Sequence, residues 1–405
     1  MTPLAARTRS LPSDAAPDLL AFAGEDGWVF ERDGVGLAMR GVAARVAVRD
    51  VGACLASIAV DDEVGLPGTG AISATALPFD PDAATVADAV IPAVVLGRTA
   101  DGTSWVTTIG AREVDVDAGE VLVDHRSAAR APDAFTLTPT VSHADWCEII
   151  AKAVARIADG AFSKVVLARE VVVEASSDIV VSQVLARLQV LYPSCTVFSA
   201  DGFVGASPEL LVSRYGDTVT SHPLAGTIAH SGDADADRRA SERLLASAKD
   251  REEHGLVVSF VADVLRPFCD SLDVPDAPSI VAMRNVAHLG TLVRGRLRDD
   301  PAPSALSLAL ALHPTPAVAG TPTHDAVAYL KSVEGFDRGR YAGAVGWVDG
   351  RGDGAFVVGI RCAEIAGRLA RLFAGVGVVE GSDPDDELAE TQLKLQALLA
   401  AVVRP

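Results

Sequence analysis

Short apolar runs separated by turn residues dominate the first third of the chain. Between Trp28 and about Val123 these runs include Val42–Val48, Val90–Leu96 and Ser104–Ile109, and stretches rich in Asp and Gly interrupt them. Runs of this length between turn signals are typical of β-strands. The pattern therefore predicts a β-rich N-terminal lobe, which we place at residues 1–140.

The pattern changes after residues 124–142, which are polar and contain proline, so we expect a domain boundary there. A helix is predicted at His143–Ile157, with Ser142 as its N-cap. The other predicted helices are Ser182–Leu191, Ala234–Leu265, Pro303–Leu312, Thr323–Lys331 and Asp385–Val403. The predicted strands are Lys164–Val173, Ser194–Ala200, Leu210–Tyr215, Ala342–Val348, Ala355–Ala363 and a hairpin of Ala363–Ala366 with Leu369–Ala374. Hairpins interspersed with helices favour an α+β fold.

The charge balance excludes several classes of partner. The chain has 54 Asp and Glu against 35 Lys and Arg, a formal net charge of −19. Such an acidic surface repels nucleic-acid phosphates and anionic lipid. No apolar run is long enough to span a membrane, and the N-terminus lacks the layout of a signal peptide. Five cysteines without paired spacing suit a reducing compartment, so we expect a cytoplasmic protein.

Two polar residues beside predicted strands are candidates for acid–base chemistry. Lys164 begins an apolar strand, and it either reaches solvent at the strand end or is a partly buried amine that could act as a general base. Glu209 follows Ser207-Pro208, where the proline forces a turn. It is either an ordinary turn residue or, in an enclosed pocket, a general acid whose pKa burial raises.

Two further glutamates lie four residues from a lysine on predicted helices, Glu253 after Lys249 and Glu390 before Lys394. Residues four apart share a helix face, so each pair could be a surface salt bridge of small energetic weight. Alternatively, the two glutamates could converge from separate helices on a hard cation such as Mg²⁺. Arg361 follows a predicted strand and could bind a carboxylate with two hydrogen bonds.

Glycine clusters complete the candidate features. They lie at Leu224–Thr227, Gly343–Gly346 and Ala374–Gly377, where backbone N–H groups could approach an anion closely. None of them is a phosphate-binding loop or a dinucleotide fingerprint, and the chain contains no GxSxG elbow. Each feature is common alone, so their order along the chain carries more information than any one of them.

In that order, the segments resemble the chorismate-utilising enzyme family, which includes isochorismate, salicylate, anthranilate and aminodeoxychorismate synthases. The resemblance covers about Ser142–Val403 and rests on Ser163–Arg169, Ser207–Glu209, Leu224–Thr227, Lys249–His254, His288–Thr291, His313–Gly320, Glu334–Trp347, Arg361, Ala374–Gly377 and Ser382–Lys394. It implies the α+β chorismate-binding fold of anthranilate synthase component I, with large antiparallel β-sheets flanked by helices. It also implies a variable lobe at 1–140 and a catalytic region at 142–403.

Differences within the family imply which reaction to expect. Members that add ammonia typically carry Gln where Lys164 stands, so this chain looks like a water-adding member. Ala225 stands where aminodeoxychorismate synthases often have a nucleophilic lysine, and alanine cannot form a covalent adduct. Ala317 stands where salicylate synthases usually have Thr. The chain is thus most similar to isochorismate synthases, with salicylate synthase as the alternative enzyme and a catalytically silent chorismate-binding protein as the alternative without activity.

The resemblance also assigns roles. It implies that Lys164 is the general base for water addition at C2 of chorismate, and that Glu209 is the general acid for loss of the C4 hydroxyl. Glu253 and Glu390 would hold Mg²⁺ on the ring carboxylate of the substrate. The expected substrate-binding residues are Gly226, Thr227, His288, Ala317, Val318, Tyr341, Arg361, Gly375 and Lys394.

The expected partners follow from the same resemblance. We expect chorismate and Mg²⁺ as ligands, with neither nucleic acid nor membrane as a partner. Because water-using members are often monomers, we expect a monomer without an obligate glutaminase subunit. The product would feed either menaquinone or siderophore biosynthesis.

Overall fold

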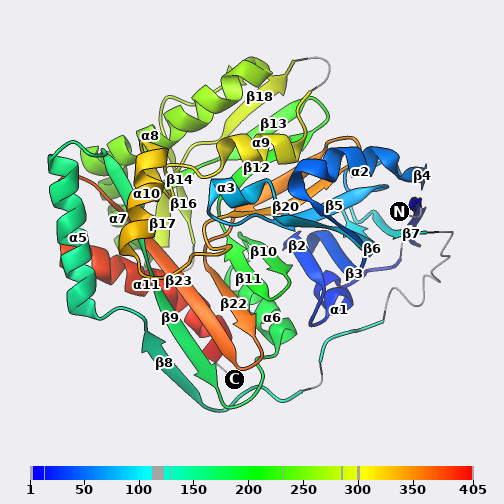
Figure 1. Cartoon of the computed structure of the whole chain (residues 1–405), viewed down its shortest axis with the longest axis horizontal. Coiled ribbons are helices and arrows are strands. Elements are labelled where there is room, and N and C mark those ends of the chain that lie inside the picture. Colours follow the sequence, from blue (N-terminus) through cyan, green and yellow to red (C-terminus); the bar gives the residue numbers. More distant parts are fainter. Residues whose placement is uncertain are drawn as a thin grey trace.

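The computed structural model describes residues 3–12, 14–111, 123–127, 129–230, 232–283, 286–298 and 302–403. Within these residues, twenty strands share one large and mostly antiparallel sheet, and three more form a small second sheet. Helices pack against both sheets (Figure 1). The expectation of an α+β fold with large antiparallel sheets flanked by helices is confirmed.

The N-terminal strands form a meander around one long pair, β3 with β6, and β6 continues into β7, which pairs with β1. Their bounds are Ala5–Ser10 (β1), Trp28–Arg32 (β2), Val35–Ala47 (β3), Ala59–Asp62 (β4), Ile72–Ala76 (β5), Asp88–Arg98 (β6) and Ser104–Gly110 (β7). The three apolar runs predicted as strands in this region fall in β3, β6 and β7, except that Val48 belongs to the 3₁₀ turn after β3.

The remaining strands of the large sheet come from the second part of the chain. They are Phe135–Pro139 (β8), Lys164–Ala175 (β9), Thr196–Ala200 (β10), Phe203–Ser207 (β11), Leu210–Tyr215 (β12), Thr218–His222 (β13), Cys269–Asp273 (β15), Val293–Leu297 (β18), Gly320–Thr321 (β19), Ala344–Asp349 (β20), Gly354–Val358 (β21), Cys362–Ala366 (β22) and Leu369–Val378 (β23). The small sheet consists of Leu224–Ala229 (β14), Ser279–Ala282 (β16) and Val286–Gly290 (β17). As predicted, β22 and β23 form a hairpin about Gly367-Arg368.

Helix α5 begins at its predicted capping residue. The side chain of Ser142 accepts a hydrogen bond from the Asp145 N–H at the start of α5, and α5 buries Trp146 and Ile150 on one face. The helices are Leu19–Ala23 (α1), Val51–Ser57 (α2), Pro81–Ala84 (α3), His143–Ala158 (α5), Val181–Leu191 (α6), Ala234–Ala246 (α7), Ala248–Leu265 (α8), Ala305–Leu312 (α9), Thr323–Val333 (α10) and Pro384–Val403 (α11), with 3₁₀ turns at Val48–Asp50 and Arg266–Phe268. Among the described helices, none combines the length and the apolar character needed to cross a lipid bilayer.

Two elements predicted from the sequence are each interrupted in the structure. The helix predicted over Ala234–Leu265 is two helices, because the Ser247 side chain accepts a hydrogen bond from the Asp250 N–H and starts α8 as a new helix. The strand predicted over Ala355–Ala363 is interrupted before Cys362, where Arg361 adopts a φ of 50°. The polar segment 124–142 contains strand β8, which pairs with β9.

Strands from the two predicted regions hydrogen-bond to each other. β2 pairs with β10, and β5 pairs with β20, so the large sheet runs through both regions. The predicted division into residues 1–140 and 142–403 therefore does not coincide with a break in the large sheet. It stays a prediction.

The pair β9 and β23 positions the functional residues. The two strands are in antiparallel register from Val165 opposite Val378 to Glu174 opposite Leu369. Helix α11 packs on β23 and also contacts α5 and α6 (Figure 1). Residues on β9, β23 and α11 therefore meet at one place, together with the N-terminal part of α8, which packs on β14.

Candidate active site

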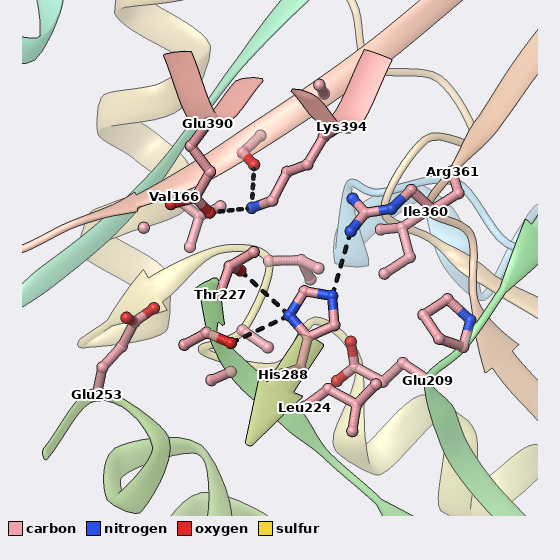
Figure 2. Close-up of a pocket in the computed structure, with 18 of the residues that line it drawn as sticks. Val166, Glu209, Leu224, Thr227, Glu253, His288, Ile360, Arg361, Glu390 and Lys394 are labelled. Carbon is pink, nitrogen blue, oxygen red and sulfur yellow. Dashed lines mark hydrogen bonds and ion pairs between the residues drawn. The ribbon is translucent and has the colours of Figure 1, made fainter. Parts of the chain in front are cut away.

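A pocket lies where β9, β14, β17, β23, α8 and α11 meet, and Figure 2 shows its labelled side chains pointing toward a common space. It is lined by Val166, Pro208, Glu209, Leu224, Ala225, Gly226, Thr227, Lys249, Asp250, Glu253, His288, Ala317, Val318, Tyr341, Ile360, Arg361, Phe373, Ala374, Gly375, Gly377, Glu387, Glu390 and Lys394. Charged and polar groups are therefore concentrated in a site walled by small apolar residues.

Glu209 lies in this pocket between strands β11 and β12, and only 3% of the residue is exposed. Its backbone is fixed, because its N–H donates to the Ser207 hydroxyl over 3.3 Å and its carbonyl accepts from the Val358 N–H. Burial raises the pKa of Glu209 to about 7, although a backbone hydrogen bond from Leu224 and the charge of Lys164 act in the opposite direction. A carboxyl group in this state can donate a proton near neutral pH.

Lys164 is the first residue of β9 and is almost fully buried, with 1% of the residue exposed. Its Nζ lies 2.8 Å from Oε1 of Glu253, so the side chain does not extend into solvent. Gly377 on β23 makes this contact possible, because a Cβ atom there would lie 2.5 Å from the Glu253 carboxylate and 3.1 Å from Cε of Lys164. The structure therefore supports the buried-amine interpretation of this lysine.

Four carboxylates line one part of the pocket. Glu253 and Asp250 come from α8, and Glu390 and Glu387 come from α11. Burial, together with the charges of Glu390 and Glu253, raises the pKa of Glu387 to about 7. Burial and the Glu253 charge likewise raise the pKa of Asp250, although its hydrogen bond with Ser247 opposes the shift. Burial and the neighbouring carboxylates thus both disfavour the charged forms of Glu387 and Asp250.

Lysines pair with these carboxylates in a pattern that corrects one sequence-based expectation. Lys249 lies 3.7 Å from Glu387 on the other helix, not against Glu253 four residues along its own helix. Lys394 does pair with Glu390 at 2.6 Å, and its Nζ donates to the Gly375 carbonyl over 2.9 Å. The Lys394 ammonium lowers the pKa of Glu390 even though burial acts against it.

The carboxylates suit a hard cation that completes its shell with other ligands. Within the described residues, no three His, Cys, Asp or Glu side chains converge as a complete metal site. Mg²⁺ is usually held by one or two carboxylates together with waters and substrate oxygens. Glu253 and Glu390, which come from separate helices, could provide such a pair.

His288 and Arg361 form a rigid unit in the centre of Figure 2. Nδ1 of His288 lies 3.0 Å from the Gly226 carbonyl and 3.1 Å from the Thr227 hydroxyl, and Nε2 lies 3.2 Å from an Arg361 nitrogen. Because a carbonyl only accepts and a guanidinium only donates, Nδ1 must carry the proton and Nε2 must accept. Burial, together with the Arg361 and Lys394 charges, lowers the pKa of His288 to about 3, so the ring is neutral.

The structure brings all the sequence-predicted substrate-binding residues to the pocket. Besides the groups above, Ala317, Val318, Tyr341 and Gly375 line its wall. Gly375 allows a close approach, because a Cβ atom there would lie 2.7 Å from the Tyr341 hydroxyl. Lys164 is not among the lining residues and reaches the site through Glu253.

Several lining residues were not predicted from the sequence. Asp250 and Glu387 each lie three residues before a predicted metal-binding glutamate. Residues three apart share a helix face, so this spacing could have identified both as pocket residues. Leu224, Ile360 and Phe373 also line the pocket. Apolar residues of this kind carry no sequence signal that separates a pocket wall from the core.

Comparisons with known proteins point to one family. A family described as "Chorismate binding enzyme" matches residues 46–403. Isochorismate synthase DhbC of Bacillus subtilis (strain 168) is 43% identical over 297 residues, which cover 70% of this chain and 74% of that protein. The crystal structure of DhbC from Bacillus anthracis superposes with a TM-score of 0.77 at 34% identity, covering 93% of this chain and 96% of that one.

A more distant structure extends the agreement in fold to nearly the whole chain. MenF, the menaquinone-specific isochorismate synthase from Escherichia coli, superposes with a TM-score of 0.83 at 24% identity, covering 99% of this chain and 95% of that one. The fold is therefore that of anthranilate synthase component I and its relatives, as the sequence predicts. The family match includes much of the N-terminal region, from residue 46 onward. The chain belongs to the chorismate-binding enzyme family.

Proposed function

We propose that this protein is an isochorismate synthase, an isomerase that converts chorismate to isochorismate. The observation that carries the proposal is a single pocket that joins Glu209, a buried carboxyl group whose pKa burial raises to about 7, to a buried lysine–carboxylate pair, Lys164 with Glu253. The likeness to isochorismate synthase DhbC supports the same reaction.

The proposed reaction replaces one hydroxyl group by another. Water is a poor nucleophile and hydroxide is a poor leaving group, so the site must supply both a base and an acid. Lys164 takes a proton from water as the oxygen bonds to C2 of chorismate. The ring double bonds shift, the bond from C4 to its hydroxyl oxygen breaks, and Glu209 donates a proton to that oxygen, which leaves as water.

The carboxylates of the substrate require countercharges. In the proposal, Arg361 and the Tyr341 hydroxyl bind the enolpyruvyl carboxylate together with the backbone near Gly375. His288 holds the guanidinium of Arg361 by accepting from it, so the cation is oriented before the substrate arrives. Preorganised charges of this kind avoid the cost of reorganising the site during the reaction.

Glu253 and Glu390 would hold Mg²⁺ near the ring carboxylate, and Asp250 and Glu387 add negative charge beside them. The ion supplies electrostatic neutralisation between an anionic substrate and an acidic site. Lys394 binds both Glu390 and the Gly375 carbonyl, so it links the proposed metal ligand to the opposite wall.

Water, and not ammonia, is the proposed nucleophile. Lys164 stands where ammonia-adding relatives typically carry Gln, and Ala225 at the pocket wall cannot form the covalent adduct of the lysine-dependent branch. We test this by incubating the purified protein with chorismate and Mg²⁺ and separating the products by chromatography. Isochorismate is expected, whereas salicylate with pyruvate would place the protein in the salicylate-forming branch, and turnover only with added ammonia would refute the role of Lys164.

The pH dependence of turnover tests the role of Glu209. The acid must be protonated to act, and burial raises its pKa to about 7, so kcat/KM should fall as the pH rises through about 7. The same upward shift from 4.5 means that protonated Glu209 stabilises the fold at low pH and that this contribution is lost as the pH rises through about 7. A kcat/KM profile with no fall above neutrality, in protein that stays folded, would exclude Glu209 as the acid.

Removing the cation or one of its proposed ligands should stop turnover. We expect chelation to abolish product formation and added Mg²⁺ to restore it. Glu390→Gln should weaken Mg²⁺ binding, measured by calorimetry, because an amide replaces a carboxylate ligand and Lys394 loses its carboxylate partner. Glu364→Gln is the matched control, since its partner Arg340 lies outside the pocket. Unchanged Mg²⁺ affinity in the Glu390 variant would contradict the assignment.

The finer assignments are part of the proposal. We propose a cytoplasmic monomer that works without a glutaminase subunit, and a product that supplies menaquinone or siderophore biosynthesis. Deleting the gene and testing growth with added menaquinone or under iron limitation separates the two pathways. Light scattering of the purified chain tests the monomer.

A further inference from the structure

One edge of strand β9 has a gap that none of the described strands fills. Strand β19 pairs with Lys164 and Val165, and strand β8 begins to pair only at Val171. The Val166 N–H still reaches the Ala319 carbonyl over 2.9 Å, but the next groups on this edge are the Val166 carbonyl and the Ala168 N–H. Backbone groups buried at such a gap need other partners.

Two side chains supply these partners. Arg338 donates from Nη2 to the Val166 carbonyl over 2.6 Å, and Glu334 accepts from the Ala168 N–H over 2.8 Å. A neighbouring strand would provide the same donor and acceptor. Arg338 and Glu334 also bind each other, with Nε of Arg338 at 2.8 Å from Glu334, and both residues are at least 95% buried, with 4% and 5% exposed.

Arg338 extends this network to the facing wall of the pocket. Its Nη1 donates to the Val318 carbonyl over 2.9 Å, and its guanidinium lies 4.2 Å from the ring centre of Phe79 and 5.6 Å from that of Tyr341. Val166, Val318 and Tyr341 all line the pocket, but Arg338 does not. One buried side chain thus connects three parts of the pocket wall that are far apart in sequence.

We propose that Arg338 and Glu334 form a positioning pair, which replaces the missing strand beside β9 and thereby holds Lys164 and the Val318 wall in place for the reaction. The inference rests on the proposed function for its catalytic consequence. Lys164 lies two residues before Val166 on the strand that the pair holds, so a shift of β9 moves the proposed base. Arg361 and Lys394, which the proposal assigns to substrate binding, lie on other elements, whereas Val318 and Tyr341 contact Arg338 directly.

A purely structural ion pair would behave differently. If the pair only stabilised the fold, its variants would lose active protein and keep the kcat of the molecules that remain folded. A positioning pair instead lowers kcat in folded protein with little change in KM. Lysine at position 338 separates the two cases, because its ammonium can pair with Glu334 but lacks the planar fork that reaches two carbonyls at once.

The experiment compares Arg338→Lys and Arg338→Gln with the wild-type chain. In folded protein, kcat for isochorismate formation should fall by about 100-fold, as expected for a base misplaced by about 1 Å, while KM for chorismate changes less than about threefold. Hydrogen exchange measured by mass spectrometry should speed up at residues 164–168 more than elsewhere in β9. Arg340→Gln is the matched control, because Arg340 pairs with Glu364 and donates to the Ala200 carbonyl away from the pocket, and it should keep both kcat and the protection of 164–168.

Two results would overturn the positioning role. The first is a folded Arg338→Lys protein with wild-type kcat, and the second is unchanged exchange protection at 164–168 in that protein. If Arg338→Gln fails to fold, the lysine variant decides. If the wild-type chain makes no isochorismate, the proposed function fails, and the exchange measurement alone then decides whether the pair holds β9.

Discussion

Replacing Glu209 with Gln is expected to lower kcat by about 10³-fold, within the range that general acids contribute. The amide has nearly the same shape and can still accept the Leu224 backbone hydrogen bond, but it has no proton to give to the departing hydroxyl. Chorismate binding, measured by calorimetry, should persist because Arg361, Lys394 and the proposed cation remain. The variant should also lose the fall in activity through about pH 7.

Glu31→Gln provides the control for this experiment. Glu31 is also buried, with 1% of the residue exposed, and burial likewise raises its pKa, but it lies outside the pocket and binds Gly34 and Gln189. Its variant should keep wild-type kcat. If Glu209→Gln folds and retains more than about a tenth of wild-type kcat, Glu209 is not the general acid, since a proton donor contributes at least about 10²-fold.

Replacing Lys164 with Met should produce a loss of similar size, about 10³-fold in kcat, because it removes the proposed base while filling nearly the same volume. The change also leaves Glu253 without its ammonium partner 2.8 Å away. An unpaired carboxylate in this position should bind Mg²⁺ at least as tightly as before. The expected signature is therefore preserved metal binding with lost turnover.

The Lys164→Arg variant tests whether position 164 requires a base or only a positive charge. Arginine can still pair with Glu253 but stays protonated, so it should be as inactive as the methionine variant. Lys152→Met is the matched control, since Lys152 is exposed and pairs with Glu148 on α5. Near-normal turnover in Lys164→Arg would mean that position 164 needs charge and not a base.

The sequence predicted helices and strands well where the hydrophobic periodicity and the capping or turn residues agreed. Helix α5 begins at its predicted Ser142 cap, and β12 has its predicted bounds, Leu210–Tyr215. The boundary between α7 and α8 at Ser247 was not predicted. Only the hydrogen bond from the Asp250 N–H to the Ser247 side chain marks the start of the new helix. The long-range pairing of β5 with β20 and of β2 with β10 has no local signal at all.

The sequence predicted part of the membership of the candidate site but not its contacts. The order of motifs identified Lys164 and Glu253 separately, but helix spacing paired Glu253 with Lys249. The observed partner is Lys164, on a strand that only the tertiary fold brings to α8. Arg338 is a stronger example, because its hydrogen bonds to Val166 and Val318 depend on a gap between strands that sequence patterns do not reveal.

The net charge of the protein does not reveal the cations that gather at the pocket. The chain carries a net charge of −19, yet Lys164, Lys249 and Lys394, three of its five lysines, lie at or beside the pocket. Each of the three pairs with a carboxylate there. The site therefore has the cations that an anionic substrate requires, within an otherwise acidic molecule.

The most direct test of the central claim is the origin of the new hydroxyl group. Purified protein is incubated with chorismate and Mg²⁺ in water labelled with heavy oxygen, and the product is analysed by mass spectrometry. We predict that the isochorismate carries one labelled oxygen, at C2. The carboxylates of unreacted chorismate should carry no label. Isochorismate without label would contradict water addition assisted by Lys164 and Glu209, and the absence of any isochorismate would contradict the proposed function.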